Sequence, residues 1–216
     1  FRKNHRLLLE VWSRLLDSLG DRTPMLVLVG GVGWKGDEIV DALAGNAQLR
    51  SKVKLLHGVN DKTLQWMYDN CLFTVYPSLY EGWGLPVAES LRHGKLCIAS
   101  TGGSLPEVAP GLAEYLDPWD LPAWSSLVSQ LVNSPALLRS KEAQLSGFQA
   151  TDWEDCAKKV MSAAPVNSPS SIGRTPLGFR SPVVFTIDEI DGASLGRDYQ
   201  LGGWSHAEKA GTWTLG

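Results

Sequence analysis

Cysteine is scarce in this chain, and its few cysteines form no recognisable pattern. The 216 residues contain three, Cys71, Cys97 and Cys156, and their wide spacing matches neither a disulfide framework nor a zinc-binding motif. Their apolar neighbours in the sequence favour buried, inert thiols. We therefore expect no metal site built on cysteine, and this cysteine usage is typical of a reducing cytoplasm.

Excess positive charge and long hydrophobic runs are also absent. The net charge is −3, so the composition gives no reason to expect a nucleic-acid-binding surface. The longest apolar run, near residues 25–29, is too short to cross a bilayer. We predict no nucleic-acid partner and no transmembrane segment. We expect a cytoplasmic protein, either free or peripheral at the inner membrane face.

Helical and strand patterns alternate along the first 163 residues. The pattern predicts strands at residues 26–30, 53–56, 72–76 and 95–100. It predicts helices at residues 6–19, 37–44, 62–68 (capped by Asp61), 86–93, 105–108, 120–132, 135–146 and 152–163. This alternation indicates an α/β fold, a Rossmann-like parallel sheet with helices on both faces. Such sheets bind ligands at the carboxyl ends of their strands.

The composition changes after residue 163. Residues 164–182 are rich in Pro, Ser and Gly and are typical of a linker. Residues 183–187 alternate like a strand, and residues 203–208 and 211–213 suggest a strand pair with glycine turns. Because residues 183–216 are too few for an independent core, we interpret them as a partial β-rich module.

The most informative segment joins the strand at residues 72–76 to the helix at residues 86–93. Gly82 and Gly84 allow a tight turn with bare backbone, and Pro86 fits the first turn of a helix, where its missing N–H costs nothing. The N–H groups of residues 83–85 would therefore point out of a helix N-terminus. Such a terminus is an anion site, and we expect it to hold a phosphate.

Two carboxylates accompany this expected phosphate site. Glu81 lies in the turn, and Glu89 lies about one turn inside the helix. Carboxylates only accept hydrogen bonds, so they suit hydroxyl-rich groups on either side of a phosphate, such as a sugar and a ribose. Ordinary solvated carboxylates are the alternative, which the glycine-rich context disfavours.

This segment resembles the retaining glycosyltransferases of the GT-B fold, in the group 1 family that includes bacterial mannosyltransferases and glycogen synthases. Their signature is two glutamates separated by seven residues, which Glu81 and Glu89 match. The resemblance covers roughly residues 1–163, and several motifs in the right order are more specific than one glycine motif. The further motifs are the basic loop at residues 1–5, the strand and turn at 26–34, the strand end at 55–59, and the closing segments at 98–100, 104–108 and 117–118.

The resemblance implies a role for each residue of the site. Lys3, with Arg2 beside it, would neutralise a diphosphate, and backbone amides near Gly84 and Leu85 would hold the distal phosphate. Glu81 would bind the donor sugar hydroxyls, and Glu89 the ribose. Lys3 and Glu81 take the catalytic role; the donor-binding residues are Arg2, Lys3, Val59, Glu81, Gly82, Trp83, Gly84, Leu85 and Glu89. No cofactor or metal is expected, because in this family's scheme the leaving diphosphate itself assists the acceptor hydroxyl.

The resemblance also implies an activity for the whole protein. It predicts a hexosyltransferase of polysaccharide biosynthesis that moves a mannose- or glucose-like hexose from a nucleotide diphosphate sugar to a glycan, a lipid-linked acceptor or another hydroxyl. The chain would begin after the first strand of the donor-binding domain, with the acceptor-binding domain before it. We therefore expect this chain alone to bind the donor and to transfer nothing.

Other interpretations stay open at this point. A GT-B sugar-nucleotide epimerase shares the Rossmann-like half and the phosphate site, but it would release a free epimerised sugar. A catalytically silent sugar-nucleotide-binding module would share only the donor signature. Some single residues also have simpler interpretations. Arg2 and Lys3 could belong to a plain charged terminus, and Glu107 could cap the short helix after Ser104. His57 and His93 suit surface or packing roles.

Overall fold

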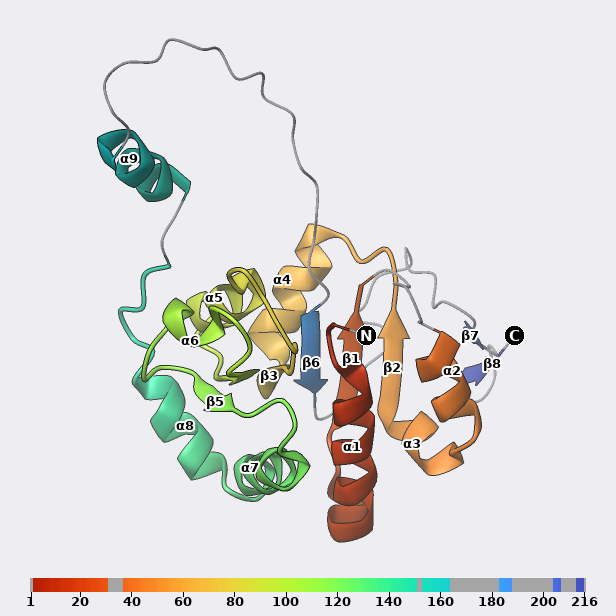
Figure 1. Ribbon diagram of the computed structural model, residues 1–216. Coiled ribbons are helices and arrows are strands. Elements are labelled where there is room, and N and C mark those ends of the chain that lie inside the picture. The colour runs from red at the N-terminus through yellow and green to blue at the C-terminus, as the bar shows by residue number, and fades with distance from the viewer. Residues whose placement is uncertain are drawn as a thin grey trace.

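The computed structural model describes residues 2–30, 37–150, 153–163, 183–187, 204–206 and 213–215 (Figure 1). The strands are β1 (Met25–Val29), β2 (Val53–Leu56), β3 (Phe73–Tyr76), β4 (Cys97–Ser100), β5 (Glu114–Leu116), β6 (Val183–Ile187), β7 (Trp204–His206) and β8 (Trp213–Leu215). The helices are α1 (His5–Leu19), η1 (Gly20–Arg22), α2 (Asp37–Ala44), α3 (Ala47–Lys52), α4 (Asp61–Asn70), α5 (Leu85–Arg92), α6 (Leu105–Val108), α7 (Leu121–Asn133), α8 (Pro135–Ala143) and α9 (Trp153–Ala163).

The main sheet has the strand order β2-β1-β6-β3-β4-β5. β1 is parallel to β2, and β3, β4 and β5 are parallel to one another. β6 lies between the two parallel groups and runs antiparallel to both neighbours, so that Phe185 pairs with Val27 on one side and with Thr74 on the other. Figure 1 shows its arrow pointing against those of β1 and β2. The sheet is therefore the predicted α/β sheet with one antiparallel strand at its centre.

Helices cover both faces of this sheet, as the sequence predicts. Successive side chains of a strand point to opposite faces. In β1, Leu28 packs into the cluster that contains the fully buried Trp12 of α1 and Trp124 of α7. The adjacent Val27 packs into a second cluster with residues of α4. β1 is thus buried on both sides, as is typical of the central strand of an α/β fold.

Most element boundaries agree with the prediction, but the two predicted helix caps are wrong and three short elements were not predicted. Asn60, not Asp61, caps α4: its side-chain oxygen accepts a hydrogen bond from the N–H of Thr63 at 2.9 Å. The side chain of Ser104 makes no capping bond to α6, so the predicted Ser104–Glu107 cap is wrong; the Glu107 N–H bonds to the Ser104 carbonyl instead. The sequence pattern also gave no sign of η1, α3 or β5, which are short.

The strand predicted at residues 183–187 forms, but it lies in the main sheet as β6. Alternating residues identify a strand without identifying its partner, since several edges can accept the same pattern. β7 and β8 pair antiparallel with each other, as expected for residues 203–213. The predicted linker at residues 164–182 lies outside the described residues, and the division into domains stays a prediction.

Cys71, directly after α4, and Cys97, in β4, are buried and form no disulfide. Burial raises the pKa of Cys71 to about 12 and that of Cys97 to about 12. Thiols with such pKa values carry almost no thiolate near neutral pH, as expected for inert buried cysteines. Cys156 of α9 is also free and is half-buried.

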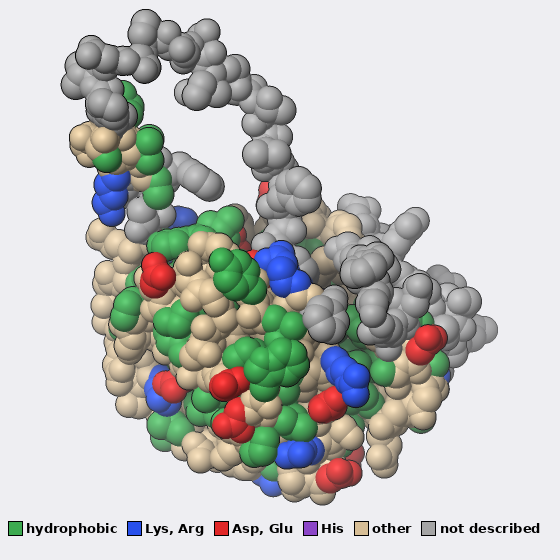
Figure 2. All heavy atoms as spheres, viewed as in Figure 1, with side chains coloured by type: hydrophobic (Ala, Val, Ile, Leu, Met, Phe, Trp, Pro, Cys, Tyr) green, Lys and Arg blue, Asp and Glu red, His purple; other side chains and the backbone are tan. Residues whose placement is uncertain are grey.

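The molecular surface carries both signs of charge. On the face drawn in Figure 2, acidic and basic side chains are interspersed among hydrophobic and neutral ones. Among the helices that the structure describes, none has the length and hydrophobicity needed to span a membrane. The location of the protein in the cell stays a prediction.

Candidate functional site

Two loops meet at the carboxyl ends of the parallel strands. Residues 2–4, just before α1, lie against the turn that follows β3, where the N–H of Leu79 donates to the carbonyl oxygen of Arg2 at 2.8 Å. The side chain of Asn4 donates to the carbonyl oxygen of Pro118 at 2.9 Å, just beyond β5. Segments far apart in the sequence therefore come together at the edge where sheets of this class bind ligands.

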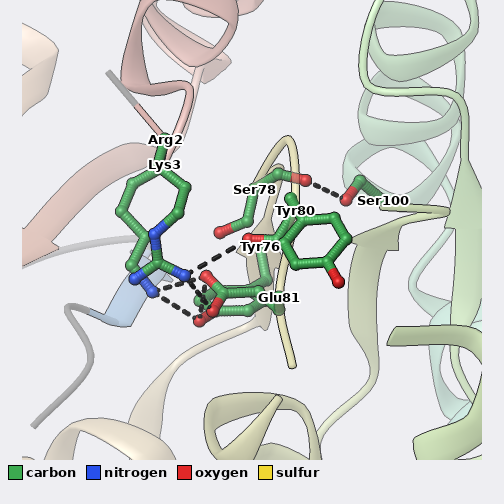
Figure 3. Close-up of polar contacts among 7 residues, drawn as sticks. All are labelled: Arg2, Lys3, Tyr76, Ser78, Tyr80, Glu81 and Ser100. Atoms are coloured by element: carbon green, nitrogen blue, oxygen red, sulfur yellow. Dashed lines mark hydrogen bonds and ion pairs between the residues drawn. The ribbon is translucent and has the colours of Figure 1, made fainter. Parts of the chain in front are cut away.

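The Glu81 carboxylate is the centre of this junction (Figure 3). Lys3 Nζ lies 2.6 Å from Glu81 Oε1, and the Arg2 guanidinium pairs with Oε2. Tyr76, the last residue of β3, donates from Oη to Glu81 Oε1 at 3.0 Å and accepts a hydrogen bond from Lys3 at 2.7 Å. The two cations predicted to neutralise a diphosphate are thus both held by the carboxylate predicted to bind the sugar.

Burial and charge act in opposite directions on Glu81. Burial pushes the pKa of this carboxyl upward, but hydrogen bonds from Lys3 and Tyr76, the nearby Ser78 hydroxyl and the charge of Lys3 outweigh it. The net result is a pKa below the ordinary glutamate value, so Glu81 is a carboxylate at neutral pH.

Lys3 is the more enclosed of the two cations. Its side chain is 12% exposed, against 55% for Arg2. Burial lowers the pKa of Lys3, Glu81 offsets part of this shift, and the charge of Arg2 adds to it. Because charges interact more strongly where water is excluded, a bound anion would interact more strongly with Lys3 than with Arg2.

Glycines that follow β4 hold the turn that carries Glu81. Gly103 has φ +65° and forms a bridge with Glu81, and a Cβ there would collide with the Glu81 backbone. A Cβ on Gly102 would collide with the carbonyl oxygens of Ser78 and Leu79. The sequence reasoning missed both residues, although a Gly-Gly pair directly after a predicted strand was the available signal.

Serines tie the same turn to the end of β4. Ser100 Oγ donates to the carbonyl oxygen of Ser78 and accepts from the N–H of Gly102 at 3.2 Å (Figure 3). Ser78 is fully buried, and its own Oγ lies near Glu81 without a hydrogen bond of good geometry to any described residue. The position of Glu81 is therefore set from β3, β4 and the loop before α1.

The predicted helix N-terminus lies directly after this turn. α5 begins at Leu85, with Pro86 in its first turn and Gly84 as its N-cap. In the part of the chain that the structure describes, the N–H groups of Trp83, Gly84 and Leu85 donate to no protein acceptor. These groups are available to an anion, as the sequence predicts for a phosphate.

Two glycines of the turn differ in what they permit. Gly84 has φ +141°, and a Cβ there would lie 2.5 Å from the Leu105 side chain, so packing against α6 already requires glycine. A Cβ on Gly82 would meet nothing within 4 Å. Trp83 and Leu85 are 40% and 43% exposed. The turn therefore has open space beside Gly82 and two partly exposed apolar side chains.

Glu89 and Val59, the predicted ribose and base contacts, lie beside α4. Tyr68 of α4 donates from Oη to Glu89 Oε2 at 2.7 Å. Val59 packs against the cluster that includes Tyr68. The structure thus brings Arg2, Lys3 and Glu81 into one cluster and places Glu89 and Val59 against a neighbouring helix.

The two histidines of this region contact protein groups. His57 Nδ1 pairs with the Gly30 carbonyl oxygen, and His93 stacks on Tyr68. Both contacts agree with the expected packing roles. Within the described ranges, no group of three or more His, Cys, Asp or Glu side chains is placed to hold a metal ion. That the reaction needs no metal or cofactor stays a prediction.

Solved structures that share this fold are GT-B glycosyltransferases. WaaG, a glycosyltransferase involved in lipopolysaccharide biosynthesis, matches with a TM-score of 0.59 at 17% identity, over 76% of this chain and 44% of that one. Anabaena Alr3699/HepE in complex with UDP-glucose matches with a TM-score of 0.61 at 16% identity, over 74% of this chain and 46% of that one. These matches confirm the predicted Rossmann-like half of a GT-B fold.

The chain belongs to the family of group 1 glycosyl transferases, whose model matches residues 1–112. O-antigen chain mannosyltransferase B of Escherichia coli is 31% identical over 163 residues, which cover 75% of this chain and 42% of that protein. The chain thus spans less than half the length of this curated relative. The family predicted from Glu81, Glu89 and the ordered motifs is confirmed.

Proposed function

We propose that this chain forms the donor-binding part of a retaining hexosyltransferase that uses a nucleotide diphosphate sugar. The main observation behind this proposal is that Lys3 and Arg2 form ion pairs with Glu81 beside the N-terminus of α5, in a chain of the group 1 family. Two findings on similar proteins support it: Alr3699/HepE was solved with UDP-glucose, and several relatives are named mannosyltransferases.

The ion pairs suggest how the donor enters. Lys3 and Arg2 now neutralise Glu81, so a diphosphate must compete with Glu81 for them. When the cations turn to the diphosphate, Glu81 regains free acceptor positions. A sugar hydroxyl can then donate to it, because a carboxylate offers about four acceptor sites. Diphosphate and sugar recognition are thereby coupled through the same carboxylate.

The same groups would stabilise the leaving diphosphate. Negative charge grows on it as the glycosidic bond breaks, and Lys3, Arg2 and the N–H groups of residues 83–85 lie where they could interact with that charge. In comparable sites, one well-placed donor is worth about 3–4 kcal/mol of barrier lowering. In this proposal no side chain acts as a nucleophile, and the diphosphate assists the acceptor hydroxyl.

The proposal also concerns the acceptor substrate and its binding site. A glycan or lipid-linked acceptor would bind to a domain that precedes this chain, on the cytoplasmic side, free or at the inner membrane face. Mannosyltransferase relatives support a mannose-like donor and a role in polysaccharide biosynthesis. The same relatives disfavour an epimerase, because they are named as transferases.

Replacing each glutamate in the full-length enzyme tests these roles. Glu89→Ala should weaken binding of the nucleoside diphosphate by about 1–3 kcal/mol, because ribose hydroxyls lose their partner. Glu81→Ala should leave that affinity unchanged or higher, since it frees both cations, and should reduce turnover strongly.

Calorimetry with GDP and UDP, beside turnover with the corresponding sugar nucleotides, makes this comparison. Glu10→Ala is a matched control, since Glu10 is a surface carboxylate paired with Arg6 on α1. Equal losses of diphosphate affinity in the Glu81 and Glu89 variants would reject the division of roles.

A further inference from the structure

Glu89 is held by a tyrosine that no sequence motif singled out. Tyr68 lies in the last turn of α4 and is 2% exposed. Its Oη donates to Glu89 Oε2 at 2.7 Å, across the space between α4 and α5. Glu89 itself is half-buried and lies one turn into α5. This contact joins a fully enclosed hydroxyl to a carboxylate at the edge of the candidate site.

A second pair of residues fixes the ring of Tyr68. His93, four residues after Glu89, stacks on that ring with centroids 5.0 Å apart and an angle of 14° between the planes. His93 Nδ1 lies 2.7 Å from Oδ1 of Asp69, the neighbour of Tyr68 on α4. Because residues four apart share a helix face, Glu89 and His93 present one surface of α5 to one surface of α4. The Tyr68 ring therefore has little freedom to leave Glu89.

The Tyr68 hydroxyl remains protonated and can therefore always donate a hydrogen bond. Burial, followed by the charge and hydrogen bond of Glu89, raises the pKa of Tyr68 well above its ordinary value. The hydroxyl consequently stays protonated at every pH at which the enzyme would work. It can donate a hydrogen bond to Glu89, and because it stays neutral it does not repel a negatively charged ligand.

The contact leaves one oxygen of Glu89 for a ligand. Among the described residues, none donates a hydrogen bond to Glu89 Oε1. With Oε2 fixed, Oε1 has a set direction before any ligand arrives. Fixing the rotamers of a glutamate in advance removes an entropic cost from binding.

We propose that Tyr68 is a positioning residue that orients Glu89 to accept a hydrogen bond from the ribose of the donor nucleotide. This inference rests on the proposed function, since it takes the nucleotide as the ligand of Glu89. In this proposal Tyr68 contributes to nucleotide binding through its hydrogen bond to Glu89. Packing between α4 and α5 does not need its hydroxyl, because phenylalanine would keep the ring and the stack on His93.

Tyr68→Phe in the full-length enzyme removes the hydrogen bond to Glu89. The probes are GDP and UDP, each beside its 2′-deoxy counterpart, titrated by calorimetry. For the nucleotide that binds the parent, Tyr68→Phe should weaken the ribonucleotide by about fivefold, the worth of one hydrogen bond. If Glu89 contacts the 2′ hydroxyl, the affinity for the 2′-deoxy counterpart should stay unchanged. The ratio of the ribonucleotide affinity to the 2′-deoxynucleotide affinity should then fall by the same factor of about five.

Two controls separate positioning from general loosening. Tyr115→Phe removes a half-buried hydroxyl that donates to the Ala109 carbonyl oxygen elsewhere in the fold, and it should change neither affinity. In a Glu89→Ala background, adding Tyr68→Phe should not weaken nucleotide binding further, because the proposed effect of Tyr68 on the ribose requires Glu89.

The outcomes distinguish this inference from the proposed function. If the parent binds a nucleotide and Tyr68→Phe behaves like Tyr115→Phe, the positioning role is overturned while the proposed function stands. Weakening by Tyr68→Phe that persists in the Glu89→Ala background would also overturn it, as a loss of local structure. If neither GDP nor UDP binds the parent, the proposed function fails, and this inference fails with it.

Discussion

Lys3 is the residue whose surroundings say most about the ligand. It is nearly enclosed, it bonds to Tyr76 and Glu81, and its Nζ lies 4.9 Å from the centroid of the Tyr76 ring. A lysine placed only to stabilise the fold would gain little from such burial, since desolvation opposes its charge. A site that must present a cation to a charged ligand explains the arrangement.

Lys3→Ala should weaken binding of a nucleoside diphosphate, and Lys3→Arg should retain part of the affinity. Raising the salt concentration should weaken binding in the parent more than in Lys3→Ala, because part of the screened attraction is already gone. Arg6→Ala removes an exposed cation on α1 and serves as the control. Titrations at low and high salt measure the effect, and identical salt dependence in the parent and Lys3→Ala would speak against a cation–diphosphate contact.

The glycine turn offers a second test at the residue scale. Gly84→Val mixes two effects, because Gly84 packs against Leu105 as well as facing the expected phosphate. Gly82 avoids this problem, since a Cβ there meets open space. Gly82→Ala should therefore leave the free energy of unfolding within about 0.5 kcal/mol of the parent. It should weaken diphosphate binding if a ligand occupies that space.

Gly84→Ala should lower the free energy of unfolding by about 1–3 kcal/mol, through its clash with α6 and its backbone conformation. Chemical denaturation separates the two variants, and calorimetry on the folded Gly82→Ala protein then tests the ligand. If Gly82→Ala folds and binds like the parent, the anion does not lie against this part of the turn.

His5 gives a prediction for acid stability. Burial, with nearby positive charge, lowers the pKa of His5 to about 4 from 6.5. The unfolded chain therefore takes up a proton at higher pH than the folded chain does. The stability linked to neutral His5 is fully present above pH 6.5 and is lost as the pH falls toward 4. Glu81 acts at lower pH, because its folded pKa lies below the ordinary value of about 4.3.

The Tm of His5→Gln should consequently fall less than that of the parent between pH 7 and pH 5. Thermal unfolding followed by circular dichroism at several pH values measures this difference. Parallel curves for the two proteins would show that His5 is not the group that titrates.

At the scale of elements, the segment from β3 to α5 follows from local sequence. Its apolar run, two glycines and Pro86 each favour the conformation they adopt, so the boundaries and the exposed N–H groups could be predicted. The contacts of Glu81 with Arg2 and Lys3 could not be derived from local pattern, because they join residues nearly eighty positions apart. The hydrogen bond from Tyr68 to Glu89 could not be predicted either, because it joins residues of two different helices.

β6 shows most clearly where prediction from the local sequence stops. Its alternation predicts a strand, yet nothing local predicts that it would pair with both β1 and β3. Within the described ranges it is the strand that joins the two parallel groups of the main sheet. Its pairing is therefore expected to stabilise the whole sheet.

Phe185→Pro should lower the free energy of unfolding by about 3 kcal/mol or more, because proline removes a ladder donor at the centre of a sheet. Thr214→Pro, in the separate pair of β7 and β8, should cost much less. Urea unfolding of both variants makes the comparison. Equal stabilities would mean that β6 does not hold the sheet together.

At the scale of the whole molecule, this chain matches only part of the length of its relatives. The family match covers residues 1–112, and the chain spans 42% of its E. coli relative. The proposed donor-binding residues, from Arg2 to Glu89, lie within the described residues, and our proposal assigns acceptor recognition to another part of the protein. Binding of the donor and its transfer are therefore separable properties, and this chain alone should bind sugar nucleotides weakly and transfer nothing.

The central claim is that a nucleotide diphosphate sugar binds where Lys3 and Glu81 meet the N-terminus of α5. Calorimetric titration of this chain with GDP-mannose and UDP-glucose, beside Lys3→Ala and Arg6→Ala, tests it most directly. We predict saturable binding of one of them to the parent, unchanged binding to Arg6→Ala and clearly weaker binding to Lys3→Ala. Absence of binding to the folded parent, or equal binding to all three proteins, would contradict the claim.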